Sequence, residues 1–186
     1  TGSGKTYALW IPILADILQT SADSKAEKGL KAVWITPLRA LSLEIKQSIE
    51  SFIKDLDLPF QVGIRTGDTS QKERTKQKRN MPDFLITTPE SLQLLLASKD
   101  YHKTFKNCNA IVVDEWHELL GTKRGVQMEL ALSRIKNSTT NLRIWGISAT
   151  IGNLNQALEV LLGDAASNKD STILIKANLQ TKIVVE

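Results

Sequence analysis

The first six residues have the composition and spacing of a phosphate-binding loop. The glycines of Thr1-Gly2-Ser3-Gly4-Lys5-Thr6 let the backbone turn its N–H groups toward phosphate oxygens, and a helix that begins there adds a favourable dipole. Lys5 is predicted to contact the β- and γ-phosphates of a nucleoside triphosphate, and the Thr6 hydroxyl to ligate Mg²⁺. The predicted phosphate-binding residues are Gly2, Ser3, Gly4, Lys5 and Thr6. A flexible linker of the same composition is the alternative, because the first half of the pattern is missing and we expect the chain to begin inside the loop.

Two adjacent acids follow a short apolar run at residues 110–113. Ligands of open α/β sheets collect at the carboxyl ends of the strands. Asp114 is predicted to hold Mg²⁺ there, and Glu115 to orient or deprotonate an attacking water. Acids in this position also occur as helix caps or solvated loop residues. Metal-assisted phosphoryl transfer needs both a phosphate loop and such acids, and the presence of both in one chain favours the catalytic interpretation, with Lys5, Asp114 and Glu115 as the catalytic residues.

The few histidines and cysteines argue against a structural metal site. The chain has two histidines and one cysteine, too few for the usual zinc ligand sets. We expect His117 to form a hydrogen bond between the nucleotide site and a neighbouring segment, with a plain structural histidine as the alternative. Cys108 is expected to be a small buried hydrophobic residue.

Short apolar runs alternate with stretches of helical periodicity, which is the pattern of βα units in a parallel sheet. The predicted strands are 32–36, 60–64, 84–87, 110–113 and 142–147, with 172–175 or 182–185 as a last one. The predicted helices are 7–18, 38–53, 91–96, 126–135 and 154–162. The sequence therefore predicts an α/β fold, a mostly parallel sheet with helices on both faces.

Composition indicates a single domain of ordinary globular character. The chain has 186 residues and a formal charge of +4, which suits a surface that binds polyanions without requiring one. No run approaches the roughly 20 apolar residues of a membrane span, since the longest candidate, 8–15, is interrupted by Pro12. We expect a cytoplasmic protein without a membrane partner.

Five segments, in this order, resemble the motifs I, Ia, Ib, II and III of superfamily 2 helicases. They are Gly-Ser-Gly-Lys-Thr (2–6), Thr-Pro-Leu-Arg-Ala-Leu (36–41), Thr-Pro-Glu-Ser-Leu (88–92), Asp-Glu-Trp-His (114–117) and Ser-Ala-Thr (148–150). The resemblance implies a RecA-like P-loop NTPase fold. It also implies that residues 1–164 form the first motor domain and 165–186 a connector toward a second one.

Trp116 within the acidic segment, followed by residues 118–125, resembles the large-helicase-related group, and within it the ligase-associated DEXH-box branch. That branch implies an ATP-dependent DNA helicase or translocase in DNA repair with 3′-to-5′ polarity, which uses Mg²⁺ and ATP. The implied partners are single-stranded or tailed duplex DNA, a second RecA-like domain that supplies arginine fingers, and DNA ligase and nuclease proteins. The isolated chain is then expected to be inactive or weakly active.

The resemblance also implies residue roles outside the nucleotide site. Ser148 and Thr150, together with His117, would couple ATP hydrolysis to movement of the strand. The residues implied to line the nucleic-acid track are Thr36, Pro37, Arg39, Gly67, Thr88, Pro89 and Glu90. Residues 65–79 add six basic side chains to this region against two acids, which suits phosphate binding but equally a solvated helix face.

Three alternatives remain open on these residues. An RNA helicase of the same fold shares the motor chemistry, although Asp-Glu-Trp-His differs from the Asp-Glu-Ala-Asp of the commonest RNA group. A nucleotide-binding interaction module without catalysis would not need the intact Lys5, Asp114 and Glu115. A P-loop small-molecule kinase would leave the segments at 36–41, 88–92 and 148–150 unexplained.

Overall fold

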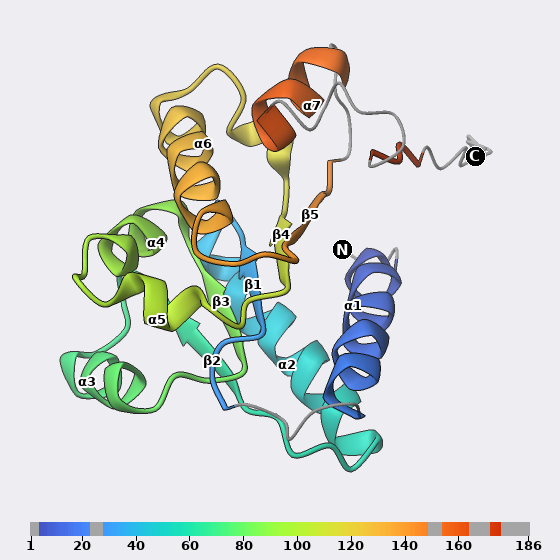
Figure 1. Ribbon diagram of the computed structural model, residues 1–186, viewed down its shortest axis with the longest axis vertical. Helices are drawn as coiled ribbons and strands as arrows, with labels where there is room; N and C mark the ends of the chain where they lie inside the picture. The colour runs from blue at the N-terminus through green and yellow to red at the C-terminus, as the bar shows by residue number, and fades with distance from the viewer. Residues whose placement is uncertain (1–3, 23–27, 149–153, 164–171, 176–186) are drawn as a thin grey trace, which may run out of the picture.

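The computed structural model describes residues 4–22, 28–148, 154–163 and 172–175. Within them the chain forms a five-stranded sheet, every neighbouring pair parallel, in the order β2-β3-β1-β4-β5 (Figure 1). The strands are β1(Ala32–Ile35), β2(Val62–Arg65), β3(Phe84–Thr87), β4(Ala110–Val113) and β5(Arg143–Gly146). The predicted parallel α/β sheet is confirmed.

Helices connect the strands and cover both faces of the sheet. They are α1(Lys5–Ala22), α2(Arg39–Asp55), α3(Gln71–Arg79), α4(Pro89–Leu96), α5(Tyr101–Phe105), α6(Lys123–Lys136) and α7(Leu154–Leu162), with a 3-10 turn η1(Trp116–Glu118). α1 and α2 lie on one face, and α4, α5 and α6 lie on the other (Figure 1).

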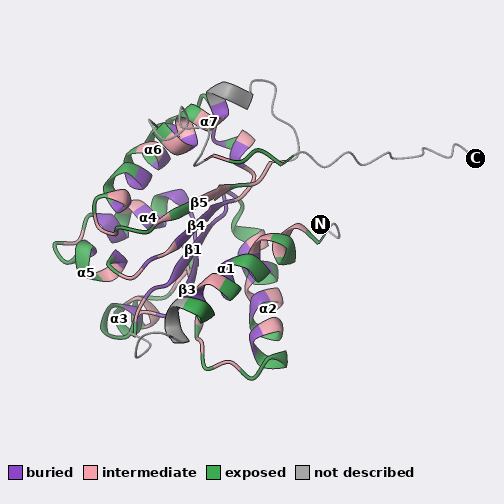
Figure 2. Cartoon of the chain, turned by 45° about the vertical axis from the view of Figure 1, so that its right-hand side comes forward, coloured by how far each residue is buried: buried purple, intermediate pink, exposed green. Residues whose placement is uncertain are grey.

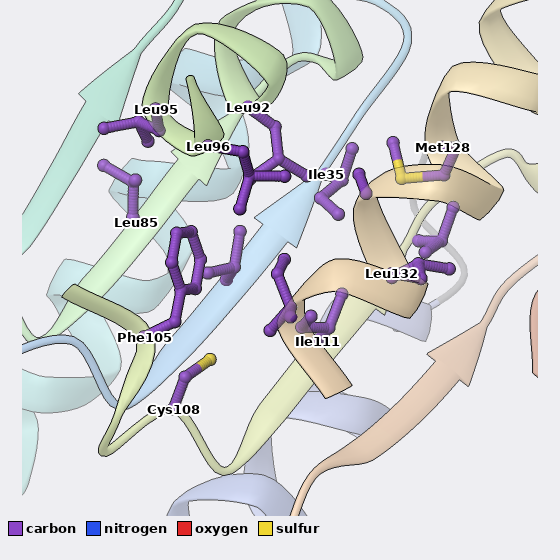
Figure 3. Close-up of a cluster of buried hydrophobic side chains, with 14 of the residues drawn as sticks. Ile35, Leu85, Leu92, Leu95, Leu96, Phe105, Cys108, Ile111, Met128 and Leu132 are labelled. Carbon is purple, nitrogen blue, oxygen red and sulfur yellow. The ribbon is translucent and has the colours of Figure 1, made fainter. Parts of the chain in front are cut away.

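The central strand β1 shows why these short runs are buried on both sides. Side chains alternate along a strand, so Ala32 and Trp34 join the cluster with α1 and α2, while Val33 and Ile35 join the cluster with α4 and α6. Figure 3 shows Ile35 between the leucines of α4 and Met128 of α6. A strand covered on both faces reads as a continuous apolar run, which is the signal in the sequence.

Burial follows the layers. Figure 2 shows the central strands β1, β3 and β4 buried and the outer faces of the helices exposed. Cys108 is fully buried in the cluster below α4 and α6, and this burial raises the pKa of its thiol to about 12. The expected role of Cys108 as a small buried hydrophobic residue is confirmed.

The predicted helix at 7–18 is confirmed as part of α1, and Pro12 lies inside it on the exposed side, where the carbonyl that it leaves without a donor can be hydrated. Two other expectations about elements were wrong or incomplete. Residues 172–175 form no strand, while 182–185 lie outside the described residues. The structure adds α5, for which no helix was predicted, and α3, for which a solvated helix face was one of two alternatives. In the described part of the chain, no helix has the length and apolar character needed to cross a membrane.

Candidate functional site

The two adjacent acids lie where β4 ends, at the carboxyl edge of the sheet. The backbone there is fixed by the neighbouring strands: the N–H of Asp114 donates to the Ile35 carbonyl at 2.8 Å, and the N–H of Trp116 donates to the Ile147 carbonyl at 2.8 Å. The indole of Trp116 is buried and donates to the Ala157 carbonyl at 3.1 Å. The acids are therefore attached to a rigid part of the fold.

Two N–H donors hold the carboxylate of Asp114. Trp34 Nε1 donates to Oδ2 at 3.3 Å, and the backbone N–H of Glu115 donates to Oδ1 at 2.9 Å. Burial raises the pKa of Asp114 above its usual range, while the hydrogen bond from Trp34 opposes that rise. Trp34 was not predicted to serve the site, because it lies 80 positions away in the sequence.

Glu115 adopts an unusual backbone conformation that directs its side chain. Its φ of 46° and ψ of 47° lie in the left-handed region, which costs a non-glycine residue about 1–3 kcal/mol. Glu115 Oε1 lies 3.8 Å from Lys5 Nζ, and Oε2 lies 3.4 Å from His117 Nδ1. The structure thus brings the predicted lysine and the predicted base together across the start of α1.

Lys5 and Glu115 line an open cleft of about 450 Å³. Its polar wall includes Lys5, Thr6, Asp114 and Glu115. Gly4 has a left-handed φ of 67°, and its carbonyl accepts the N–H of Ala8 at 3.0 Å, so the loop turns directly into α1. Gly2 and Ser3 lie outside the described residues.

The donor set of the cleft fits a magnesium-bound nucleotide. One half-buried carboxylate, Asp114, and one hydroxyl, Thr6, are hard oxygen ligands of the kind Mg²⁺ prefers, and this ion usually takes its other ligands from phosphates and water. Among the described residues, no group of three or more His, Cys, Asp or Glu side chains could hold a metal by itself. The residues thus fit a metal that arrives with phosphates rather than a protein-only metal site.

His117 connects the acids to the segment after β5. Its Nδ1 lies 3.0 Å from the Ser148 hydroxyl and 3.4 Å from Glu115 Oε2. The expected hydrogen bond between the nucleotide site and a neighbouring segment is therefore present. Thr150, the other residue implied to couple hydrolysis to movement, lies outside the described residues.

Two threonines of the implied nucleic-acid track have hydroxyls that are turned inward. Thr36 is 0% and Thr88 is 1% exposed. The Thr36 hydroxyl bonds with the backbone of Leu38, and the Thr88 hydroxyl caps α4 by accepting the N–H of Ser91 at 3.4 Å. Both hydroxyls are therefore used within their own loops. Pro37 and Pro89 are also buried and stiffen the same two loops.

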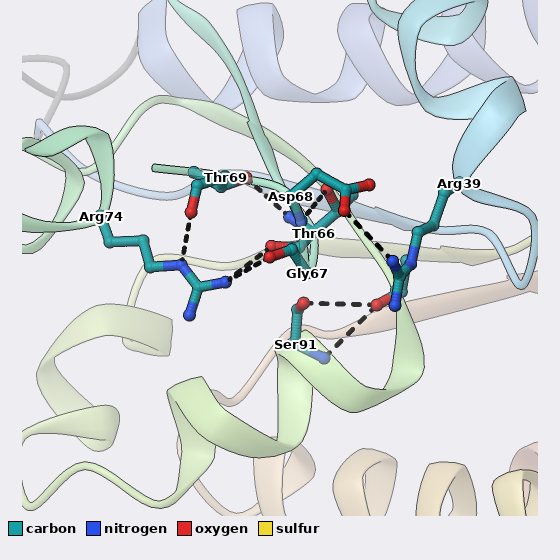
Figure 4. Close-up of polar contacts among 8 residues, drawn as sticks. Arg39, Thr66, Gly67, Asp68, Thr69, Arg74 and Ser91 are labelled. Carbon is teal, nitrogen blue, oxygen red and sulfur yellow. Dashed lines mark hydrogen bonds and ion pairs between the residues drawn. The ribbon is translucent and has the colours of Figure 1, made fainter. Parts of the chain in front are cut away.

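Arg39 and Gly67 meet at the edge of this region. Arg39 Nη1 lies 3.2 Å from Asp68 Oδ1, and a β-carbon on Gly67 would lie 2.9 Å from the Arg39 guanidinium. Figure 4 shows Arg39 and Arg74 on opposite sides of the 66–69 turn. Arg74 donates to the carbonyls of Thr66, Gly67 and Thr69 at 2.9–3.1 Å. Arg74 therefore stabilises the turn.

The rest of the basic segment forms the surface of α3. Lys72, Lys76, Lys78 and Arg79 are exposed, and none of them forms a salt bridge with an acid in the described ranges. Gln77 is the buried residue of this helix and donates to the Ile64 carbonyl at 2.9 Å. An exposed helix face is confirmed, and phosphate binding by that face stays a prediction.

Glu90 is exposed, but its carboxylate has a partner. Arg124 Nε donates to Glu90 Oε1 at 2.7 Å, and Arg124 Nη2 donates to the Pro37 carbonyl at 3.1 Å. Desolvation would raise the pKa of Glu90, but hydrogen bonds from its own backbone N–H and from Arg124 lower that pKa overall. Sequence reasoning missed Arg124, although it stands in the segment compared with the large-helicase-related group.

Comparison with known proteins places this arrangement in a family. The family model described as DEAD/DEAH box helicase matches residues 1–157. The ATP-dependent helicase Lhr-Core of Methanothermobacter thermautotrophicus is 29% identical over 100% of the chain and 23% of the relative.

Solved structures give the same result. The Mycobacterium smegmatis helicase Lhr bound to ssDNA and AMP-PNP has a TM-score of 0.70 and 31% identity, covering 88% of this chain and 22% of that one. The DEAD-box helicase Mss116 bound to ssRNA and UDP-BeF has a TM-score of 0.75 and 25% identity, covering 87% of this chain and 33% of that one. The chain spans about a quarter of the length of the curated relative and of the solved Lhr chain.

Proposed function

The chain belongs to the DEAD/DEAH box helicase family, and from that premise we propose that it is the ATP-hydrolysing first motor domain of an Lhr-like DNA helicase or translocase. The RecA-like fold and the resemblance to Lhr helicases support this proposal. The observation that carries it is the meeting of Lys5, Asp114 and Glu115 in one cleft at the carboxyl edge of the sheet.

Each residue of the cleft has one task in hydrolysis. Lys5 holds the β- and γ-phosphates, and its charge balances the negative charge that develops on them. Asp114 and the Thr6 hydroxyl are the residues that would hold Mg²⁺, and the ion would supply positive charge beside the phosphates. Glu115 accepts a proton from the attacking water at its carboxylate. Lys5 Nζ and Glu115 Oε1 form a long ion pair of 3.8 Å. A triphosphate enters the cleft by replacing this weak pair as the partner of Lys5.

ATP hydrolysis is coupled to movement of the bound DNA strand through His117. The imidazole bonds the Ser148 hydroxyl and lies beside Glu115, so a change at the γ-phosphate alters the hydrogen bonds of the segment after β5. We include Thr150, which follows in the same segment, among the coupling residues. The second RecA-like domain of the full-length protein supplies the other half of the cleft.

Single-stranded DNA lies across the loops that follow β1, β2 and β3. Arg39 supplies charge, while loop N–H groups near Thr36, Gly67 and Thr88 bind backbone phosphates. The finer parts of the proposal are 3′-to-5′ polarity, a role in DNA repair, placement in the ligase-associated branch with ligase and nuclease partners, and a cytoplasmic location. They rest on the sequence resemblance.

The test compares DNA and RNA as activators of ATP hydrolysis by the full-length protein, with single strands of the same sequence. The proposal predicts stimulation by DNA above that by RNA. Stronger stimulation by RNA would favour the RNA helicase alternative, for which the likeness to the ssRNA-bound Mss116 is the supporting observation. No hydrolysis with either strand would favour the non-catalytic module.

A further inference from the structure

Arg124 joins three segments that are far apart in the sequence. It lies in the first turn of α6, its Nε bonds the carboxylate of Glu90 in the first turn of α4, and its Nη2 bonds the carbonyl of Pro37 in the loop after β1. The planar guanidinium has donors on two edges, which a lysine does not have. One side chain therefore links the two loops of the proposed nucleic-acid track.

The backbone of this turn is locked onto the segment that follows the catalytic acids. Thr122 caps α6 by accepting the N–H of Gly125 at 3.1 Å, and its hydroxyl donates to the Leu119 carbonyl at 2.7 Å. A β-carbon on Gly125 would lie 2.2 Å from the Leu119 carbonyl oxygen, which backbone atoms cannot tolerate. The start of α6 is thus fixed against residues 116–122, directly after Asp114 and Glu115.

The contacts between α4 and α6 make this link stiff. The two helices lie side by side (Figure 1), and their apolar side chains belong to one buried cluster (Figure 3). Gln93 Nε2 of α4 also donates to the Gln127 carbonyl of α6. A displacement of α6 therefore carries the first turn of α4 with it.

Glu90 has a charge of the wrong sign for a phosphate contact. A free carboxylate in the track would repel the nucleic-acid backbone, but its ion pair with Arg124 neutralises it. The pair leaves Arg124 Nη1 without a hydrogen bond to any residue in the described ranges. Glu90 is thus better placed to hold Arg124 than to bind a phosphate.

We propose that Arg124 is a positioning residue that holds the two track loops in one geometry and ties them to the segment after the catalytic acids. Glu90 is its anchor, and Gly125 permits the close backbone approach. Nucleic-acid binding and ATP hydrolysis are then connected through the side chain of Arg124 at the start of α6. The inference rests on the proposed motor function and adds residues to it.

The test uses Arg124→Ala, Arg124→Lys, Glu90→Gln and the double variant Glu90→Gln/Arg124→Ala in the full-length protein. Anisotropy of labelled single-stranded DNA is followed across a salt series, together with DNA-stimulated ATP hydrolysis and AMP-PNP affinity. The control is Arg134→Ala, because Arg134 lies on the same helix with its guanidinium 4.2 Å from the centre of the Tyr101 ring and away from both loops.

Arg124→Ala is expected to weaken DNA binding about fivefold, the value for losing one partly exposed ion pair of about 1 kcal/mol. DNA-stimulated hydrolysis is expected to fall by at least the same factor, while AMP-PNP affinity stays at the wild-type value. Arg124→Lys should fail to restore the coupling, since it lacks the second donor edge. Glu90→Gln and Arg124→Ala should be non-additive, because both break the same link.

Four results would overturn the inference: wild-type DNA binding and stimulation in Arg124→Ala, an equal loss in Arg134→Ala, full rescue by Arg124→Lys, or additive effects of the two substitutions. A fall of about one in the salt slope would also overturn it, because that change marks a direct phosphate contact. If Arg124→Ala does not fold, Arg124→Lys and Glu90→Gln test the same link, since each of them alters one side of the Arg124–Glu90 ion pair. A wild-type protein without DNA-stimulated hydrolysis would instead refute the proposed motor function.

Discussion

Replacing Trp34 with Phe should raise the Mg²⁺ concentration that the full-length protein needs to bind nucleotide. The indole N–H of Trp34 donates to Asp114 Oδ2 at 3.3 Å, and phenylalanine keeps an aromatic ring but lacks the donor. A hydrogen bond to a charged group contributes about 1.5–3 kcal/mol, and the length of this one places it at the lower end. A loss of about 1.5 kcal/mol corresponds to roughly a tenfold higher half-saturating Mg²⁺ concentration, which agrees with the usual effect of removing a residue that orients a metal ligand.

Trp10→Phe is a matched control. Trp10 is 2% exposed and Trp34 is 3% exposed, and both belong to the cluster that α1 and α2 form with the sheet. Trp10 Nε1 has no hydrogen-bond partner among the described residues, so its loss removes similar packing without touching Asp114. Both variants should lower the free energy of unfolding by about 1–3 kcal/mol through lost packing.

The assay is a calorimetric titration of AMP-PNP at several Mg²⁺ concentrations, with urea unfolding of the same samples. Trp34→Phe should shift the Mg²⁺ dependence, and Trp10→Phe should leave it unchanged. An equal shift in both variants would mean that the effect comes from the core. No shift in Trp34→Phe would show that the indole does not hold the metal ligand.

Three further predictions concern the charged groups. Glu115→Gln should stop single-turnover hydrolysis while Mg²⁺-AMP-PNP still binds. Asp114→Asn should weaken Mg²⁺ binding, and its hydrolysis rate should recover in part with excess Mg²⁺. An identical Mg²⁺ response of the two variants would contradict the assigned roles. Because burial raises the pKa of Asp114, the folded protein binds this proton more tightly than the unfolded chain. Lowering the pH from neutral should therefore stabilise the metal-free fold through this group while weakening Mg²⁺ binding. Asp114→Asn should remove this group's contribution to both responses, which pH-dependent unfolding and Mg²⁺ titration measure against the wild type. Reversing the charges of Lys72, Lys76 and Lys78 should weaken DNA binding and lower the salt slope by about one for each lost contact; an unchanged slope would leave α3 as a solvated face.

The three central strands β1, β3 and β4 could be predicted because burial on both faces forces a continuous apolar run. The run at 110–113 is such a case, and the acids after it had to lie at the carboxyl edge of the sheet. α3 gives no such signal, because its buried residue is Gln77, which is held by a hydrogen bond to the Ile64 carbonyl. The helix periodicity of apolar residues is therefore absent from that segment.

The roles of Trp34 and Arg124 depend on contacts that no local pattern encodes. Trp34 lies 80 positions from Asp114, and Arg124 lies 34 positions from Glu90 and 87 from Pro37. The strand order brings these residues together, and the sequence pattern alone does not specify that order. Thr36 and Thr88 show the converse, because the resemblance implied that they line the nucleic-acid track while the fold turns their hydroxyls inward.

Steady-state ATP hydrolysis by the full-length protein with saturating single-stranded DNA, compared between the wild type and Lys5→Ala, tests the motor assignment most directly. Lys5 has a side chain that is 42% exposed, so its loss should change the free energy of unfolding by no more than about 0.5 kcal/mol. Its charge acts on the phosphates, and its removal should lower turnover by about 100-fold or more. A folded Lys5→Ala protein that hydrolyses ATP at the wild-type rate would contradict the account.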